Sequence, residues 1–449
     1  MKIVIIGYGT AGMTAAGYAR VTNRKASIIV FERRSYAVYH PCSLPDLIAG
    51  SLERSAVVEE APRMPNLVVH TSTIVEEVDV SGRKVRARDL RSGKVIEEEY
   101  DALILATGSK PYIPRAIRVE DSRGVYTLKV VEDAEAISGV ASKYSSAVVV
   151  GGSALGIEVA YALRKRGLKV TLVEYFPQLM PGKLDPELAE RVAHFLSSAG
   201  VEVMLGKGVA EVGGPEGEKK VTTADGETLE AGFVVMATGV RPDVELAKQM
   251  GLEIGETGGV RVDEFMRTSI EGVYAAGDVA EVKDLITGKP TLSLFASTAL
   301  LMGRVAGINA AGGREEFRGV LQNWVVNLEG FKFGAVGLTE QAARKAGIDV
   351  MTATVTAPEK PRFYPGYTEV TIKLVVERDE GRVVGAQVLG RGEVVEKLNL
   401  LSVAIARGLT ISELPHLEFA YTPSLNEVVH PIYVAADAIL RRFKRLRRG

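Results

Sequence analysis

The chain has 449 residues, of which 46% are hydrophobic, enough for roughly three domains of about 150 residues each. A net charge of −1 creates no overall field that favours nucleic acid. The single cysteine excludes an internal disulfide framework, a cysteine-rich metal centre and a dithiol within one chain, and no apolar run reaches the roughly 18 residues of a membrane span.

The chain opens with MKIVIIGYGTAG, a short apolar run followed by three glycines. This spacing is typical of a dinucleotide-binding turn between a strand and a helix. Gly7 permits the sharp exit from the strand, Gly9 lets the backbone approach a pyrophosphate, and Gly12 lets the helix pack closely on the sheet. Because the strand starts at residue 2, we expect no signal peptide and a cytoplasmic protein.

A small, apolar helix is predicted over residues 11–19, with its free N–H groups directed at the phosphates. A second strand is predicted over residues 27–31. It ends in Glu32, twenty residues past Gly12, where a carboxylate can accept both hydroxyls of an adenosine ribose. Together these features predict a nucleotide-binding module at the start of the chain.

The loop RRSYAVYHPC leads to a short predicted helix from Ser43 to about Ala49. Residues 67–100 alternate strand-like runs with turns and predict an antiparallel insertion. The sequence DALILATGSKPYIP then predicts a return to a parallel strand.

The chain next repeats itself. AVVVGGSALG at 147–156 again predicts a strand, a glycine turn and a helix, and the strand at 169–173 ends in Glu174. A second antiparallel piece is predicted over 201–230. ALILATGSKP at 102–111 and FVVMATGVRP at 233–242 close the two units with the same Ala-Thr-Gly-x-x-Pro sequence. Two nucleotide modules in tandem are therefore predicted.

VYAAGDVAE at 273–281 predicts a buried strand that ends in Gly277-Asp278, and residues 292–312 predict a long helix rich in small residues. From about Phe317 strands dominate, followed by predicted helices near 392–407 and 424–446. We interpret this last part as a third, α+β domain.

These motifs, in this order, resemble the FAD-dependent pyridine nucleotide–disulfide oxidoreductases over the whole chain. Cys42, FYPGY at 363–367 and AYTP at 420–423 are similar to the coenzyme A-disulfide reductases and their NADH oxidase and NAD(P)H sulfur (polysulfide) reductase relatives. The sequence departs from the family pattern at PCSLPD around the cysteine, and at Ser153, which stands where the middle glycine of the second turn is usual and would crowd a pyrophosphate slightly.

The resemblance implies an α/β fold with two Rossmann-like nucleotide-binding domains, the NAD domain inserted in the FAD domain, and a C-terminal α+β dimerisation domain. It places the FAD domain at 1–112 and 243–315, the NAD(P)H domain at 113–242 and the dimerisation domain at 316–449. It also implies a homodimer whose C-terminal domain completes the partner's active site.

We predict FAD and NADH as cofactors, with NADPH as an alternative donor and coenzyme A as a further ligand; no metal is expected. The predicted cofactor-binding residues are Gly7, Gly9, Thr10, Ala11, Gly12, Glu32, Arg33, Ala106, Thr107, Gly108, Gly151, Gly152, Ser153, Leu155, Gly156, Glu174, Gly239, Gly277, Asp278 and Ala296. Asp278 should bond the flavin ribityl chain, with the next helix pointing its N-terminus at the ring. Glu174 suits the free ribose hydroxyls of NADH and repels a 2′-phosphate.

Cys42 is the predicted redox centre. It precedes the helix Ser43–Ala49, whose positive end favours a thiolate and so a lowered thiol pKa; a shift of about three units from the ordinary value of about 8.5 would make the group mostly thiolate at pH 7. A thiolate beside the flavin can attack a disulfide or polysulfide sulfur. With no second cysteine, the oxidised resting state must be a mixed disulfide, a persulfide or a sulfenate.

Tyr364 and Tyr421 match the family tyrosines that reach across the dimer toward the cysteine, where a phenol can donate to a leaving thiolate. His40 could bias the thiolate, but we expect it only to line the loop. The basic tail RRFKRLRRG at 441–449 is interpreted as a solvated helix end. Contacts to coenzyme A phosphates, or weak attachment to anionic lipid through the face of Ile439, Phe443 and Leu446, are alternatives.

The predicted function is transfer of electrons from NAD(P)H through flavin and Cys42 to a small sulfur substrate, either coenzyme A disulfide or polysulfide. An NADH oxidase or peroxidase that cycles Cys42 through a sulfenate is the first alternative. A reductase of a protein electron carrier such as rubredoxin, which would not need Cys42, is the second. A nucleotide-dependent interaction protein without turnover is the third.

Overall fold

The apolar run at the start of the chain forms the central strand of a parallel sheet in the computed structural model, which describes residues 1–446 and the side chains of residues 1–443. This sheet has five strands in the order β22-β9-β1-β2-β5. All neighbours pair in parallel, and the strands are β1 (Lys2–Ile6), β2 (Ser27–Phe31), β5 (Leu67–His70), β9 (Ala102–Leu105) and β22 (Val273–Ala275). The first predicted module is confirmed.

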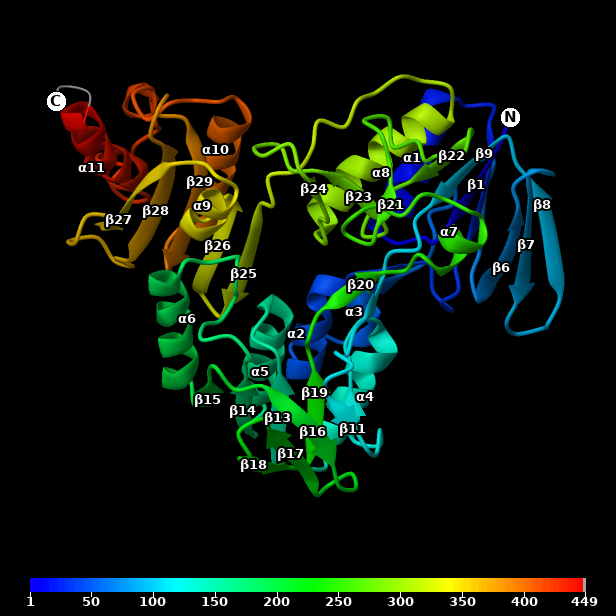
Figure 1. Ribbon diagram of the computed structural model, residues 1–449, viewed down its shortest axis with the longest axis horizontal. Coiled ribbons are helices and arrows are strands. Elements are labelled where there is room, and N and C mark those ends of the chain that lie inside the picture. Colours follow the sequence, from blue (N-terminus) through cyan, green and yellow to red (C-terminus); the bar gives the residue numbers. More distant parts are fainter. Residues whose placement is uncertain (447–449) are drawn as a thin grey trace.

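Two helices pack against each other beside this sheet, α1 (Thr10–Thr22) and α8 (Ala296–Ala310) (Figure 1). Their backbones touch, because a Cβ atom on Gly303 or Gly307 would lie 2.3 Å from a backbone oxygen of α1. The small residues predicted for the long helix therefore serve this close approach. The helix begins at Ala296, four residues later than the predicted start at 292.

The second module repeats the same plan with the order β12-β19-β13-β14-β15, again all parallel. The helices α4 (Val131–Ala141), α5 (Ala154–Lys165) and α6 (Pro186–Ser198) accompany it. Its strands are β12 (Val125–Tyr126), β13 (Ser146–Val150), β14 (Lys169–Val173), β15 (Val201–Met204) and β19 (Phe233–Met236). The predicted internal repeat is confirmed.

The predicted antiparallel pieces were wrong at their first strands. Residues 67–70 and 201–204 are β5 and β15, the parallel edge strands of the two main sheets. Each strand is only four residues long and comes shortly before the antiparallel strands in the sequence. Its hydrophobic pattern therefore could not be told apart from theirs. The antiparallel strands are β6 (Thr73–Asp79), β7 (Lys84–Asp89) and β8 (Val95–Glu99) in the first module, and β16 (Val209–Gly213), β17 (Lys219–Thr223) and β18 (Thr228–Ala231) in the second. The short strand β11 (Arg118–Val119) pairs with β16 in parallel.

The two modules are joined by a two-stranded antiparallel ribbon of β10 (Ser109–Pro111) and β20 (Val240–Pro242). Two threonines close it symmetrically. Thr107 donates from its hydroxyl to the carbonyl oxygen of Asp243 at 2.8 Å, and Thr238 donates to that of Tyr112 at 2.6 Å. The two copies of the Ala-Thr-Gly-x-x-Pro sequence thus form the two strands of the ribbon that joins the modules.

The C-terminal domain holds a five-stranded antiparallel sheet in the order β25-β26-β29-β28-β27. Its helix α11 starts at Pro431 rather than near 424, because Asn426 bonds the backbone of Ala420 and Thr422 in a loop. The elements are β25 (Trp324–Leu328), β26 (Phe331–Gly337), α9 (Glu340–Lys345), β27 (Val350–Pro358), β28 (Glu369–Glu377), β29 (Val383–Gly390), α10 (Val394–Ala406), η2 (Leu414–His416) and α11 (Pro431–Leu446).

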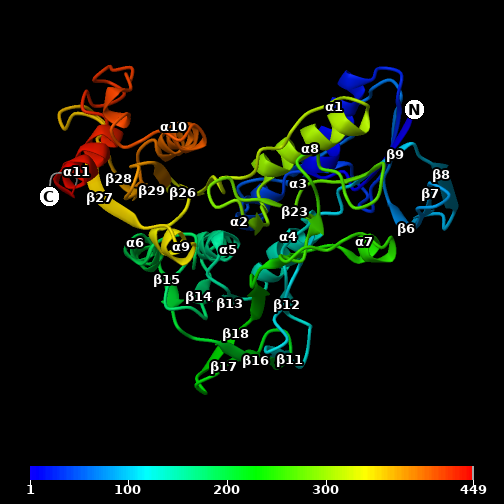
Figure 2. The same ribbon diagram turned by 45° about the horizontal axis from the view of Figure 1, so that its top comes forward.

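Figures 1 and 2 show the two modules and the C-terminal domain as separate bodies around the helix α2 (Leu44–Ala49) and its neighbours. The remaining short elements are β3 (Val38–Tyr39), η1 (Pro41–Ser43), α3 (Arg54–Val57), β4 (Val58–Glu59), α7 (Glu245–Gln249), β21 (Val260–Arg261), β23 (Ala280–Lys283) and β24 (Pro290–Thr291). Among the described helices, none combines the length and the apolar character that crossing a bilayer requires. The side chains of the basic tail from residue 444 onward, Leu446 included, lie outside the described residues.

Candidate active site

The first glycine turn has the tight geometry that its sequence predicts. Gly7 has φ +94°, and a Cβ atom there would lie 2.3 Å from the carbonyl oxygen of Ala106. A Cβ atom on Gly12 would lie 2.0 Å from the oxygen of Gly7. By contrast, no atom lies within 4 Å of a Cβ built on Gly9, the residue before α1. The open side of Gly9 at a helix N-terminus fits a pyrophosphate.

Glu32 is buried at the end of β2, but its carboxylate is already engaged by protein groups. Oε2 accepts from the backbone N–H of Tyr8 at 2.7 Å, and the guanidinium of Arg34 binds both oxygens, at 2.6 and 2.8 Å. Arg34 also lies over the ring of Tyr39, at 4.2 Å from its centroid. Arg34 was not predicted as a site residue, although it stands only two residues after Glu32 in the sequence. A ribose at this site must share the carboxylate with Arg34.

The second turn repeats this arrangement without the arginine. Glu174 accepts from the backbone N–H of Gly152 at 2.5 Å and from that of Phe176 at 2.8 Å. Within the described part of the chain, no cationic side chain lies within ion-pair distance of Glu174. Each of its oxygens therefore keeps a free acceptor position. Tyr175 beside it is 71% exposed.

Ser153, the departure from the usual glycine, caps α5. Its hydroxyl accepts from the backbone N–H of Gly156 at 3.4 Å and lies 3.3 Å from the carbonyl oxygen of Ala237. The hydroxyl is thus directed at protein atoms of its own module. Leu155 lies in the first turn of α5, Arg33 is exposed, and Gly108, Gly151, Gly239 and Gly277 all have positive φ.

Asp278 forms a compact polar cluster where the strands of the first module end. Its carboxylate accepts from the hydroxyl of Ser109 at 2.6 Å and pairs with the ammonium of Lys129 at 3.3 Å. Lys129 also donates to Ser109 at 2.8 Å. Asp278 was predicted as a site residue, but Ser109 and Lys129 were not, because only the fold brings these two beside it.

Cys42 lies at the junction of the two modules, in η1 directly before α2. The helix α2 packs against α4 and α5, and its residues Leu44, Leu47 and Ile48 belong to the apolar core of the second module. The cysteine side chain itself is exposed, and the thiol is free. The predicted position before a helix is confirmed.

The prediction of a lowered thiol pKa was wrong for the protein's own environment. Burial of the sulfur raises the pKa of Cys42, and the negative charges of Glu158 and Asp278 raise it further. Lys129 acts in the opposite direction and only in part offsets them. Cys42 is exposed as a residue, but protein atoms surround its sulfur on most sides and reduce the hydration of a thiolate there. The sequence showed the helix but not the two carboxylates.

Glu158 near Cys42 was not predicted either. It lies on α5 between Ile157 and Val159, which are both fully buried, and burial together with the charge of Asp46 raises the pKa of its carboxyl to about 7. A charged residue between two buried apolar ones on the helix of a nucleotide turn was the signal available. Glu158 can hold or release a proton near neutral pH.

His40 is directed at Glu59, with Nε2 2.6 Å from Oε1. This agrees with the prediction that His40 lines the loop. Tyr364 and Tyr421 lie in the C-terminal domain, on the loop before β28 and on the loop before α11. Tyr421 is 50% exposed, and Tyr364 packs against Phe363 at 5.5 Å between ring centroids. The two tyrosines thus belong to a different domain from Cys42.

An ionic group, here called the loop anchor, joins the two tyrosine loops: Glu359, Glu396, Lys397 and His430. Glu396 is exposed, and the other three are buried. Lys397 is 1% exposed, and its ammonium lies 2.7 Å from Glu359 and 3.0 Å from Glu396. His430 is also buried and lies 3.5 Å from Glu396. The backbone of Glu359 accepts from the N–H of Glu427 and donates to Thr368, so it binds both loops.

Comparisons with known proteins agree with this geometry. The chain is 37% identical over 449 residues to an NADH oxidase of Methanocaldococcus jannaschii, covering 98% of this chain and 99% of that protein. It is 35% identical to the CoA-dependent NAD(P)H sulfur oxidoreductase of Pyrococcus furiosus, covering 98% of this chain and 99% of that protein. The solved structure of a NAD-dependent persulfide reductase from A. fulgidus matches with a TM-score of 0.94 and 36% identity, covering 99% of this chain and 84% of that one.

Residues 1–303 match the family described as pyridine nucleotide-disulphide oxidoreductase, and residues 326–432 match its dimerisation domain. The predicted fold class is confirmed, as are an oxidoreductase function and FAD and NAD(P)H as the cofactors. The chain belongs to the pyridine nucleotide-disulphide oxidoreductases.

Proposed function

We propose that this enzyme reduces a small sulfur substrate, a disulfide of coenzyme A or a polysulfide, through Cys42. The observation that carries the proposal is the position of Cys42 at the junction of the two nucleotide modules, between Asp278 of the first and Glu158 of the second. The names of the sulfur oxidoreductase and the persulfide reductase among its relatives support the substrate class.

The FAD site in this proposal comprises the first glycine turn, Glu32 with Arg34, and the Lys129–Asp278 pair. The open side of Gly9 and this set of polar donors fit the group. FAD, when bound, would pass an electron pair from NAD(P)H to sulfur. Residues 1–112 and 243–315 are assigned to this domain, 113–242 to the NAD(P)H domain and 316–449 to dimerisation.

The second turn is proposed to bind NADH in preference to NADPH. Glu174 has a free acceptor position on each oxygen for the two ribose hydroxyls, and its negative charge opposes a 2′-phosphate. Gly151, Gly152, Ser153 and Gly156 would hold the pyrophosphate at the start of α5.

In the sulfur step, the Cys42 thiolate attacks one sulfur of the substrate. The substrate S–S bond breaks, a Cys42–S bond forms, and the departing thiolate takes a proton. The electron pair supplied by NADH then breaks the Cys42–S bond. This restores the free Cys42 thiolate and releases the second sulfur fragment as a thiolate, which takes the second proton. The overall reaction consumes one disulfide, one NADH and one proton, and it yields two thiols and NAD⁺.

The proton donor is proposed to be Tyr421, with Tyr364, of the second copy in a homodimer. Both tyrosines lie on loops with exposed apolar side chains, among them Phe363 and Leu425, which are 80% and 67% exposed. The match to the dimerisation domain supports a dimer that covers these loops. Coenzyme A is proposed as a ligand at this shared site.

The test compares the FAD-loaded wild type with Cys42→Ser. We expect NADH to bleach the flavin in both proteins under anaerobic conditions, but only the wild type to turn over coenzyme A disulfide or polysulfide. Mass analysis of the wild-type cysteine, with and without reductant, should reveal a coenzyme A adduct or a persulfide. Full turnover by Cys42→Ser would refute the proposal and favour a reductase of a protein carrier.

A second candidate function, NADH oxidation by oxygen or peroxide, is favoured by the 37% identity to an NADH oxidase. In that case Cys42 would cycle through a sulfenate. Rapid NADH oxidation in air without added disulfide, and a sulfenic acid on Cys42, would select this function over the first.

A further inference from the structure

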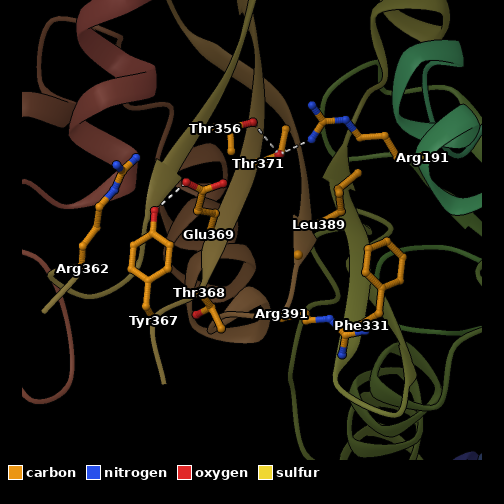
Figure 3. Close-up of a pocket in the computed structure, with 11 residues that line it drawn as sticks. Arg191, Phe331, Thr356, Arg362, Tyr367, Thr368, Glu369, Thr371, Leu389 and Arg391 are labelled. Carbon is orange, nitrogen blue, oxygen red and sulfur yellow. Dashed lines mark hydrogen bonds between the residues drawn. The ribbon is translucent and has the colours of Figure 1, made fainter. Parts of the chain in front are cut away.

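A hollow between α6 and the C-terminal sheet lies outside the groups assigned to the reaction (Figure 3). Its volume is about 800 Å³, within the range of small-molecule sites. Its lining comes from α6, from β26, β27 and β28 with the loop between β27 and β28, and from the end of β29 with the residue after it. The hollow has three arginines: Arg191 on α6, Arg362 on the loop between β27 and β28, and Arg391 directly after β29.

These three guanidinium groups have no carboxylate within ion-pair distance in the part of the chain whose side chains are described. Arg191 donates to the hydroxyl of Thr371 at 2.5 Å. Arg362 lies over the ring of Tyr367, and Arg391 lies near the ring of Phe195. The buried ammonium groups of Lys373 and Lys397, by contrast, are paired with acids. Positive charges that line one hollow without an acid partner favour the binding of an anion there.

The hollow carries a net positive charge. One carboxylate, that of Glu369, is among its lining residues, and it accepts from the hydroxyl of Tyr367 at 2.5 Å. Three guanidinium groups and one carboxylate leave a net charge of 3 − 1 = +2. The electrostatic preference is therefore for an anion with more than one negative charge.

One side of the site is rigid. Thr371 is 2% exposed, and its hydroxyl is shared between Arg191 and Thr356, which lies 2.8 Å away. This holds the guanidinium of Arg191 at the wall of the hollow, as Figure 3 shows. Fixed, planar guanidinium groups bind paired phosphate oxygens well.

Apolar side chains also line the hollow. Phe331 and Leu389 lie on the same side of it as Arg191 and Arg391 (Figure 3), and Phe331 stacks on Phe195 with ring centroids 4.3 Å apart and planes 11° from parallel. An inorganic polyanion would leave these apolar side chains unused. A ligand that has both linked phosphates and a planar ring matches the charged and the apolar side chains together.

We propose that this hollow binds a nucleoside diphosphate or triphosphate, at a site separate from the two glycine turns. The phosphates bind Arg191 and Arg391, the base lies against Phe331 and Leu389, and Arg362 contributes from the loop. Because α6 belongs to the second module and the other walls to the C-terminal domain, the ligand bridges two bodies of the protein.

The test uses the FAD-loaded enzyme with its second turn saturated by NAD⁺, titrated with ADP in a calorimeter. We expect one ADP per chain, and at least tenfold weaker binding by the double variant Arg191→Met, Arg391→Met. Both side chains are exposed, so the variant should fold, which its melting temperature and flavin content will verify. Arg407→Met, another exposed arginine of the C-terminal domain, serves as the matched control and should bind ADP like the wild type.

A titration with pyrophosphate shows whether the site recognises the nucleoside as well as the phosphates. Binding at least tenfold weaker than that of ADP supports a nucleotide site, whereas equal binding overturns it. Undiminished ADP binding by the double variant also overturns the proposal. The proposal is also overturned if the wild type does not bind ADP and the double variant has a changed dimer dissociation constant. That result would assign the hollow to contacts between subunits.

Discussion

The ammonium of Lys373 lies 3.0 Å from the carboxylate of Asp185, and the two side chains are only 3% and 1% exposed. Lys373 lies on β28, and Asp185 immediately precedes α6, so the pair crosses the junction between the C-terminal domain and the second module. Gln387 donates to the same carboxylate at 2.6 Å and accepts from the backbone N–H of Asp185 at 2.7 Å. The junction is therefore fixed by a buried, hydrogen-bonded ion pair.

Removing the cation from this pair should be strongly destabilising. Lys373→Met leaves the buried carboxylate of Asp185 without a counter-charge, and we expect a loss of about 3–5 kcal/mol in the free energy of unfolding. Urea unfolding followed by circular dichroism measures it. Lys84→Met, which removes an exposed partner of Glu97, is the control and should have little effect. A loss as small as that of the control would contradict the structure.

Glu340 should make stability depend on acid pH. Burial alone would raise its pKa, but hydrogen bonds from Lys373 and Arg344 outweigh burial and lower the pKa to about 2. The carboxylate therefore adds stability above the unfolded pKa of about 4.3, and this contribution disappears as the pH falls toward 2. Glu340→Gln should be less stable than the wild type at pH 7, and the two should converge at low pH. Parallel curves from unfolding at a series of pH values would disprove this linkage.

The charge of Glu158 should control the reactivity of Cys42. Because burial and then the charge of Glu158 raise the thiol pKa, Glu158→Gln should lower it and accelerate alkylation by iodoacetamide in the FAD-loaded enzyme. The acceleration should grow above pH 7, since the pKa of Glu158 itself is about 7. Lys129→Met should slow the reaction. Equal alkylation rates for Glu158→Gln and wild type at pH 8.5 would rule out this coupling.

The preference for NADH over NADPH should depend on Glu174. Replacing its acceptor oxygens in Glu174→Ser should lower kcat/KM for NADH about tenfold or more, because two ribose hydroxyls lose their partner. Adding Tyr175→Arg should raise kcat/KM for NADPH by supplying a cation for the 2′-phosphate. Steady-state kinetics with both nucleotides measure the ratio. The single variant Tyr175→Phe is the control, and a similar loss of NADH activity there would assign the preference elsewhere.

The loop anchor should hold both tyrosine loops. Lys397→Met leaves Glu359 buried and uncompensated, so we expect faster amide hydrogen exchange in residues 359–368 and 418–430. The double variant Lys397→Met, Glu359→Gln removes both charges and should regain part of the protection. If the single variant exchanges like the wild type at these residues, the anchor does not order the loops.

Local patterns were sufficient for most of the fold. The glycine turns, both acids that end the second strands, and the repeated Ala-Thr-Gly exits are contiguous signals, and each formed the expected element. The edge strands β5 and β15 were misread because they are short and lie close before antiparallel strands. The sequence of a four-residue strand does not show that it pairs in parallel with a strand elsewhere in the chain.

The electrostatics of the site could not be predicted in the same way. Lys129, Glu158 and Asp278 are far apart in sequence and act together on one sulfur only because the two modules meet at α2. Arg34 was adjacent to a predicted acid, but its orientation toward Glu32 depends on the ring of Tyr39. The charges on Cys42 are a property of the assembled junction.

Ser109 and Pro242 face each other across the β10–β20 ribbon, so the chain leaves the first module and returns to it at neighbouring points. A whole folding unit could enter such a gap without changing the strand order of its host. The two similar modules are thus compatible with an origin by duplication, in which one copy of a nucleotide-binding domain was inserted into a surface turn of the other.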